Sequence, residues 1–225
     1  MLIPLLSLAL SAFAGDIVHL ETRDAVALVA DDYPSAQKGP AVVLLHMIPP
    51  HHDRKSWPVD FIESLSAAGY AVIVPDRRGS GDSKGTPEDA YKGEKGRYDV
   101  VAVVKHLKIA GFTKLVVIGA SNGTTSALDY AAWAPANDLP PVDVLGFMTG
   151  GGYTESQNSL DKVARIPAIF TFSTKERDWS VAQKAVNGDW TYKEYKGGAH
   201  GTKMFGPKPE VASDILAFLK AELDG

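Results

Sequence analysis

The chain has 225 residues, of which 45% are hydrophobic and 22% are charged, and its formal net charge is −4 at pH 7. This composition is typical of a globular protein and excludes a disordered chain. The absence of cysteine excludes a disulfide scaffold, a thiolate nucleophile and a cysteine-based zinc or iron–sulfur site. The acidic balance argues against a nucleic-acid partner, for which a clustered excess of lysine and arginine is expected.

The N-terminus is apolar, because residues 1–14 read MLIPLLSLALSAFA. This run is too short to span a bilayer, which takes about 20 residues. Its small-x-small ending suits signal peptidase cleavage before Gly15, although no Lys or Arg precedes the apolar run. We expect a signal peptide over residues 1–14, no stable membrane anchor, and an exported, periplasmic or secreted domain over residues 15–225. The alternative is a cytoplasmic protein in which the apolar start docks on the core.

Strand-like and helix-like segments alternate along the rest of the chain. The first two strands flank a short turn and predict an antiparallel hairpin. Strands that alternate with helices predict crossover connections and a mostly parallel sheet with helices on both faces, in a single domain. Ligands of such sheets bind beyond the carboxyl ends of the strands. The hairpin is expected at residues 17–22 and 26–30, further strands at 41–45, 70–74, 114–118, 144–148, 168–172 and 190–195, and helices at 57–68, 98–107, 125–133 and 211–223.

A candidate nucleophile follows the strand at residues 114–118. The sequence Gly-Ala-Ser-Asn-Gly at residues 119–123 has the pattern G-x-S-x-G between a strand and a helix. In this context the serine occupies a strained turn that lifts its oxygen clear of the sheet, and the glycines leave room where strand and helix approach closely. The helix N-terminus behind Ser121 adds positive potential for a developing oxyanion. A glycine-rich connector with an N-cap serine is the alternative interpretation.

Four motifs in chain order resemble those of the α/β-hydrolase family. Residues 44–48 (LLHMI) resemble L-H-G-x, residues 75–83 (PDRRGSGDS) resemble D-x-R-G-x-G-x-S, Ser121 occupies the nucleophile motif, and residues 197–201 (GGAHG) resemble G-x-x-H-G. The resemblance covers nearly the whole chain from about residue 17. It implies an α/β-hydrolase fold without metal or organic cofactor. In the second motif, we expect the charges of Asp76, Arg77 and Arg78 to shape the loop.

The resemblance also implies a base and an acid for Ser121. The family order of serine, acid and histidine makes His200 the expected base. The acid should follow the strand at residues 168–172, where Glu176 fits the usual position and Asp178 fits the usual residue type. Strand periodicity cannot separate them, because residues i and i+2 share a face. Glu155, after the strand at residues 144–148, is a third candidate.

The oxyanion hole needs two backbone N–H groups. The residue after the nucleophile, Asn122, gives one of them. The other comes from the loop after the strand at residues 41–45, where the motif position indicates Ile48, with Met47 as its neighbour. Met47 replaces the usual glycine, and it would be strained if that position required a positive φ. The second donor therefore stays open between Ile48 and Met47.

The expected activity follows from the resemblance. Only about 20 residues separate the strand at 144–148 from the strand at 168–172, which leaves no room for a substantial helical lid. A compact lidless chain is similar to dienelactone-hydrolase-type enzymes and small carboxylesterases. We expect a serine hydrolase that cleaves an ester or related acyl bond of a small molecule through an acyl-enzyme on Ser121. The alternatives are thioesterase, peptidase or perhydrolase chemistry and an inactive binding module, and the oligomeric state is not predicted.

Overall fold

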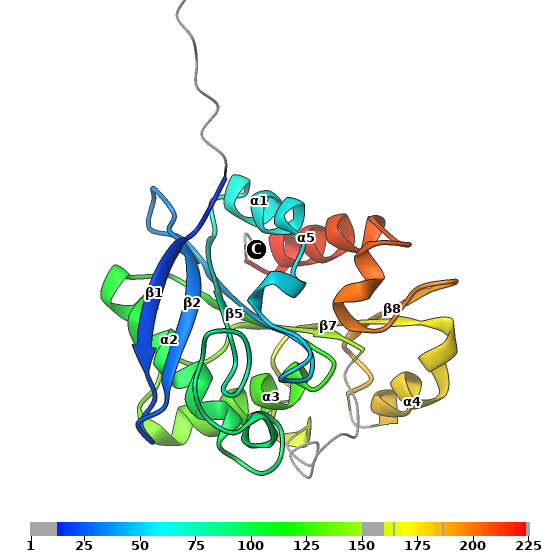
Figure 1. The fold of residues 1–225 in the computed structure, drawn as a ribbon. Coiled ribbons are helices and arrows are strands. Elements are labelled where there is room, and N and C mark those ends of the chain that lie inside the picture. The colour runs from blue at the N-terminus through cyan, green and yellow to red at the C-terminus, as the bar shows by residue number, and fades with distance from the viewer. Residues whose placement is uncertain (1–12, 150–159, 164, 186, 224–225) are drawn as a thin grey trace, which may run out of the picture.

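Eight strands form one sheet in the order β1-β2-β4-β3-β5-β6-β7-β8 (Figure 1). The structure is a computed structural model and describes residues 13–149, 160–163, 165–185 and 187–223. Strand β1 pairs antiparallel with β2, and β2 pairs antiparallel with β4, whereas all other neighbours are parallel. The predicted hairpin and mostly parallel sheet are therefore confirmed. The strands are β1 (Asp16–Glu21), β2 (Ala27–Tyr33), β3 (Ala41–Leu45), β4 (Ala71–Pro75), β5 (Leu115–Ala120), β6 (Val144–Met148), β7 (Ala168–Ser173) and β8 (Thr191–Tyr195).

The central strands are buried on both faces, which explains their continuous apolar sequences. In β3, Val43 and Leu45 pack in one hydrophobic cluster, and Val42 and Leu44 pack in a second cluster on the opposite face. The β5 side chains alternate between the same two clusters. Each cluster therefore fills the space between one face of the sheet and the helices that cover it.

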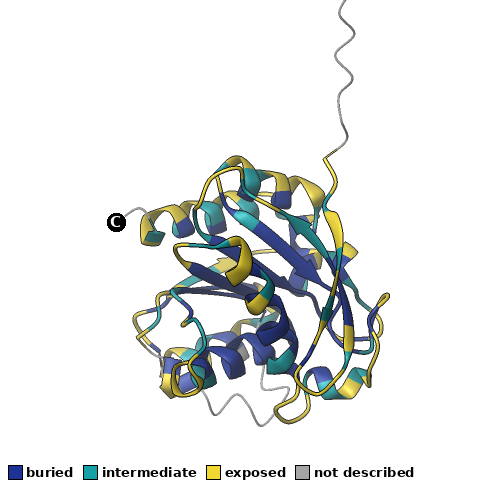
Figure 2. Cartoon of the chain, turned by 90° about the vertical axis from the view of Figure 1, so that its left-hand side faces the viewer, coloured by how far each residue is buried: buried dark blue, intermediate teal, exposed yellow. Residues whose placement is uncertain are grey.

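Helices cover both faces of the sheet. Helices α2 (Gly96–Ala110) and α3 (Gly123–Trp133) pack on one face, and α1 (Val59–Ala67) and α5 (Glu210–Leu223) pack on the other. Figure 2 shows buried strands between helices whose outer faces are exposed. The four predicted helices are present, with ends that differ by a few residues. No helix in the described part of the chain is both long enough and apolar enough to cross a membrane.

The short helices of the loops were not predicted. Helix α4 (Arg177–Ala182) and the 3-10 turns at Thr174–Glu176 and Gly201–Phe205 follow β7 and β8. They are too short to carry a clear amphipathic period. They matter for function because they determine how the chain leaves the carboxyl ends of these strands.

Buried ion pairs shape the loop after β4. Asp76 accepts hydrogen bonds from the Arg54 side chain and from the Arg54 N–H at 2.8 Å. Arg78 Nε donates to Asp99 at 2.8 Å, and Arg78 Nη1 donates to Asp24 in the turn of the β1–β2 hairpin at 2.8 Å. These pairs connect the loop to the hairpin and to α2, so the charges of Asp76 and Arg78 shape the loop as expected.

Candidate active site

Ser121 occupies a strained turn between β5 and α3. Its φ is 52°, in the left-handed region that residues other than glycine seldom adopt. The turn is closely packed, because a Cβ at Gly119 would lie 2.6 Å from Gly123 C, and a Cβ at Gly123 would lie 2.5 Å from Leu45 O. Both flanking glycines are therefore required by close approach of the backbone. Ser121 is 5% exposed.

His200 follows β8 and contacts Ser121. Its Nε2 lies 2.7 Å from Ser121 Oγ, and its Nδ1 lies 2.5 Å from Glu176 Oε1. A carboxylate accepts hydrogen bonds and cannot donate them, so Nδ1 carries the proton and Nε2 accepts the serine hydroxyl. Hydroxyl, imidazole and carboxylate thus form a continuous chain. The His200 side chain is 39% exposed, so solvent reaches this chain of hydrogen bonds at the imidazole.

Glu176 ends the 3-10 turn after β7 and is held by the residue that begins this turn. Ser173 Oγ donates to Glu176 Oε2 at 2.9 Å, and the Ser173 N–H donates at 3.4 Å. Thr149 Oγ1 donates to the same oxygen at 3.2 Å. Partial burial raises the pKa of Glu176, but hydrogen bonds from His200 and Ser173 outweigh it and leave the pKa below its ordinary value. Glu176 is therefore a well-fixed carboxylate at neutral pH.

Asp178 lies elsewhere. It is exposed in the first turn of α4, and it forms no hydrogen bond or ion pair with a described residue. Of the two acids that compete after β7, the structure brings Glu176 to His200 and leaves Asp178 at the surface. Glu155 lies outside the described residues.

Thr149 was missed by sequence reasoning. It follows β6 directly, has a φ of 52°, and accepts a hydrogen bond from the Gly201 N–H at 3.2 Å while it donates to Glu176. A β-branched residue gives no sequence signal for a left-handed backbone. The available signal was its position after a buried strand, at the edge where ligands bind. Thr149 links the Glu176 turn to the His200 loop.

The loop after β3 offers backbone donors beside Ser121. Met47 is buried and does not have a positive φ, so the strain considered for this residue is absent. Ile48 is 37% exposed. The N–H groups of Met47, Ile48 and Asn122 make no hydrogen bond with a backbone or side-chain acceptor among the described residues. All three predicted donors are therefore available to a ligand.

The histidines in and after the loop that follows β3 do not belong to a metal site among the described residues. His46 is fully buried, where its Nδ1 donates to Met47 O at 2.8 Å and its Nε2 accepts the Arg77 N–H at 2.9 Å. Burial, helped by the charge of Arg77, lowers the pKa of His46 well below its usual value, so it stays neutral. Asp53, next to His52, caps a 3-10 turn by accepting the Lys55 N–H at 2.9 Å. The described residues contain no group of three or more potential ligands that could hold a metal ion.

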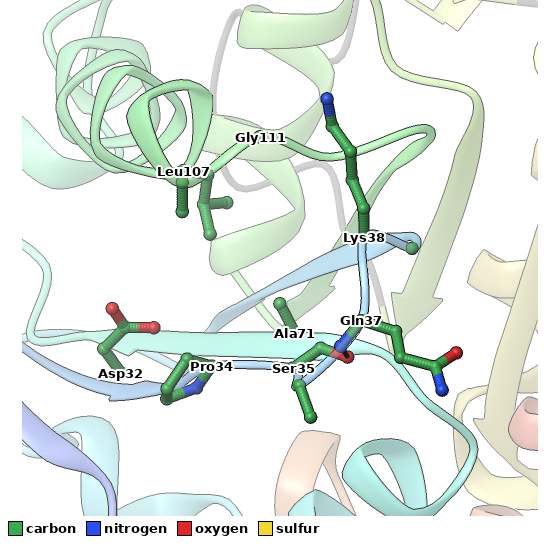
Figure 3. A pocket seen from close by; sticks show the side chains of 11 residues that line it. Asp32, Pro34, Ser35, Gln37, Lys38, Ala71, Leu107 and Gly111 are labelled. Atoms are coloured by element: carbon green, nitrogen blue, oxygen red, sulfur yellow. Dashed lines mark hydrogen bonds between the residues drawn. The ribbon is translucent and has the colours of Figure 1, made fainter.

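A separate cavity of about 310 Å³ lies at the opposite edge of the sheet (Figure 3). Its walls include Lys38 and Gly39, which precede β3, Ala71, the first residue of β4, and Gly111, which precedes β5. Ser121 follows the carboxyl end of β5, so this cavity does not belong to the site around Ser121. The remaining lining residues are Asp32, Pro34, Ser35, Ala36, Gln37, Leu107 and Ala110.

Comparison with known proteins places this arrangement in a family. The family described as the alpha/beta hydrolase fold matches residues 40–209. The chain belongs to the α/β-hydrolase family. The predicted family and fold are thus confirmed, and family membership supports a hydrolase.

Several solved structures share the fold of this chain. DcsB, solved in complex with its substrate analogue, is 14% identical with a TM-score of 0.77, and the match covers 94% of this chain and 100% of DcsB. An esterase of Pyrococcus furiosus is 20% identical with a TM-score of 0.72 and coverage of 94% and 92%. A bromoperoxidase from Bacillus anthracis is 14% identical with a TM-score of 0.70 and coverage of 91% and 100%. At these identities the likeness shows the fold alone, and no curated protein matches the sequence.

Proposed function

We propose that this α/β hydrolase is a serine hydrolase that cleaves the carboxylic ester of a small substrate through an acyl-enzyme on Ser121. The observation that carries the proposal is the hydrogen-bond chain from Ser121 Oγ through His200 to Glu176. A serine hydroxyl needs a base to become a useful nucleophile, and the base needs a third group that orients it. Glu176 is the proposed acid of the triad.

Acylation begins when Ser121 Oγ attacks the acyl carbon of the ester. His200 Nε2 takes the hydroxyl proton as the Oγ–C bond forms, and the carbonyl oxygen becomes an oxyanion. The imidazolium then returns this proton to the leaving alkoxide as the C–O bond breaks. The alcohol leaves, and the acyl group stays on Ser121.

Deacylation repeats these steps with water. His200 Nε2 takes a proton from the water as its oxygen attacks the acyl carbon, and it gives the proton to Ser121 Oγ as the ester bond breaks. The products are the carboxylic acid and the free enzyme. Glu176 stays ionised throughout, keeps the proton of His200 on Nδ1 and stabilises the imidazolium.

The oxyanion binds to backbone donors on two sides of Ser121. The Asn122 N–H is one donor, and Ile48, with Met47 as its neighbour, supplies the other. Support for this assignment is that these N–H groups lack acceptors among the described residues. Backbone N–H groups are strong donors, so those without a protein acceptor can bind an acceptor that a ligand brings.

Labelling with a fluorophosphonate probe and hydrolysis of p-nitrophenyl acetate test the proposal. Ser121→Ala should prevent labelling and lower kcat by a factor on the order of 10⁶ without unfolding the protein. Ser213→Ala, which removes an exposed hydroxyl on α5, is the matched control and should retain both properties. Activity of Ser121→Ala within about tenfold of wild type would overturn the assignment.

A panel of substrates separates the ester from its alternatives. The proposal expects faster turnover of short acyl esters than of matched thioesters or peptides. Faster turnover of a thioester or peptide would transfer the same triad to another acyl chemistry. A wild-type protein that neither reacts with the probe nor turns over any substrate would be an inactive binding module.

A further inference from the structure

Arg77 is a fully buried arginine without an ion-pair partner. Its side chain is 0% exposed, and no carboxylate among the described residues lies within ion-pair distance of it. The neighbouring Arg78, also buried, is bound by Asp99 and Asp24. Burial lowers the pKa of Arg77 to about 10, which leaves it charged at neutral pH. The charge of Asp99 offsets part of the cost of this burial without a direct contact, and the neutral oxygens that touch the guanidinium must offset the rest.

The Arg77 guanidinium binds oxygens on both sides of Ser121. Nη1 donates to His46 O at 3.2 Å and to Met47 O at 3.4 Å, in the loop after β3. The same nitrogen donates to Asn122 Oδ1 at 2.9 Å, and Nη2 donates to Asn122 O at 3.3 Å, at the start of α3. One rigid planar group thus connects the two segments that carry the proposed oxyanion donors.

The remaining contacts fix the guanidinium itself. Nη2 donates to Ala90 O at 2.5 Å and to Ser126 Oγ at 3.0 Å, and Ser126 Oγ donates to Ala90 O at 2.9 Å. These contacts come from the 3-10 turn at Pro87–Ala90 and from α3. The guanidinium is therefore also fixed by Ala90, which lies outside the two segments that it connects, and by Ser126, in the first turn of α3.

The orientation of the donors follows from the geometry of the peptide bond. In a trans peptide, the carbonyl of one residue and the N–H of the next point in opposite directions. Met47 O receives Arg77 Nη1 and His46 Nδ1, so the Ile48 N–H points away from the guanidinium. His46 O also receives Nη1, which orients the Met47 N–H in the same way. Whichever of the two N–H groups binds the oxyanion, Arg77 binds the carbonyl oxygen on the opposite side of the same peptide group.

We propose that Arg77 is a positioning residue that holds the two sides of the oxyanion hole at their working separation. This inference rests on the proposed function of Ser121. The guanidinium does not touch the substrate, but its bonds fix the loop after β3 relative to Asn122, and its charge lies behind the donors. Preorganised donors of this kind stabilise the transition state because they need no reorganisation when charge develops.

The test compares Arg77→Lys with Arg78→Lys, two variants of adjacent buried arginines. A lysine keeps the charge but presents three donors on one nitrogen and cannot bridge both segments. For each folded variant, the assays are kcat and KM for p-nitrophenyl acetate and inhibition constants for trifluoroacetophenone and acetophenone. Ser121 can add to trifluoroacetophenone to give a hemiketal oxyanion, whereas acetophenone reports binding of the ground state.

The expected result is specific to the oxyanion. Loss of one oxyanion donor costs about 10²–10³-fold in kcat, so donors that are loosened but present should cost about 10–100-fold. Arg77→Lys should lower kcat by this factor, weaken trifluoroacetophenone to a similar extent, and change KM and acetophenone binding by less than about threefold. Arg78→Lys should lower the Tm and change these constants by less than about threefold, because Arg78 contacts Asp24 and Asp99.

Two outcomes refute the inference. One is a folded Arg77→Lys that binds trifluoroacetophenone within about threefold of wild type, and the other is an equal loss for both ketones. If Arg77→Lys does not fold, Asn122→Ala takes its place, because it removes only one acceptor of Arg77 Nη1. This variant should weaken the binding of trifluoroacetophenone by about 3–10-fold, and unchanged binding would refute the inference. Ser121→Ala, measured in parallel, separates the two proposals. If this variant retains activity, the proposed function fails. If it loses activity but the Arg77 variants behave like the wild type, only the role of Arg77 is refuted.

Discussion

Replacement of Glu176 by glutamine should impair catalysis far more than its small change in size suggests. The Oε2 position of Glu176 receives the Ser173 hydroxyl, the Ser173 N–H and the Thr149 hydroxyl. Of the two ends of a glutamine amide, only the oxygen can accept these three hydrogen bonds. The NH₂ group of Glu176→Gln would therefore face His200 Nδ1.

The consequence for His200 is a change of tautomer. An NH₂ group donates, so Nδ1 must accept and the imidazole proton moves to Nε2, which faces Ser121 Oγ at 2.7 Å. His200 then cannot take the serine proton. Substitutions that impose the wrong tautomer in such triads cost about 10⁴ in kcat, so we expect a loss of about 10³–10⁴ with a smaller change in KM.

Initial rates of p-nitrophenyl acetate hydrolysis across a range of substrate concentrations measure both constants. Asp178→Asn, which makes the same chemical change two residues further along the chain, is the control. Asp178 is exposed, so its variant should stay within about threefold of wild type. A Glu176→Gln enzyme within about tenfold of wild type, or a large loss in Asp178→Asn alone, would refute Glu176 as the acid.

Three further predictions concern stability and processing. The hydrogen bond from Arg78 lowers the pKa of Asp24 from 3.8 to about 2, so the pair stabilises the fold above about pH 4; Asp24→Asn should lower the Tm at pH 7, and the difference should disappear as the pH falls from 4 to 2. Gly123→Ala should lower the free energy of unfolding by about 1–3 kcal/mol in urea titrations, whereas Gly188→Ala, whose Cβ makes an ordinary contact, should change it by less than about 0.5 kcal/mol. If residues 1–14 are a signal peptide, the intact mass of protein from its native host should correspond to a chain that begins at Gly15, and retention of the apolar run would contradict export by this route.

The sheet could be predicted because its strands have distinctive sequences. Residues 41–45 and 144–148 are apolar throughout, and both are strands with the expected bounds. Side chains on both faces of a central parallel strand must be apolar, so burial itself produces the pattern. The ends of β2 were less predictable, because Asp31, Asp32 and Tyr33 continue a strand that the apolar pattern ends at residue 30. Asp31 is accommodated there by an ion pair with Arg54, which is distant in sequence.

The position of Glu176, the proposed acid, depends on how the chain leaves β7. Glu176 and Asp178 would share a face if the strand continued, but it ends at Ser173 and the chain turns into a 3-10 turn. Glu176 stabilises this turn itself by accepting the N–H and hydroxyl of Ser173. The turn carries Glu176 toward His200, and α4 then carries Asp178 into solvent. A pattern of strand periodicity contains no information about this change of direction.

Arg77 shows a similar limit. The sequence treats Asp76, Arg77 and Arg78 as one charged cluster, yet Asp76 and Arg78 are bound by opposite charges, whereas Arg77 is bound by carbonyl, amide and hydroxyl oxygens. Residue type does not distinguish two adjacent arginines. Their different partners do, and these partners lie far away in the sequence.

Met47, which replaces the glycine of the family motif, packs against the loop that carries His200. Its side chain is buried against Gly201, and a Cβ at Gly201 would collide with the Met47 sulfur. Gly201 has a φ of 54°, and its N–H binds Thr149, which in turn binds Glu176. The methionine thus joins the loop after β3 to the His200 loop without a strained backbone at Met47, and the N–H groups of Met47 and Ile48 remain without an acceptor among the described residues.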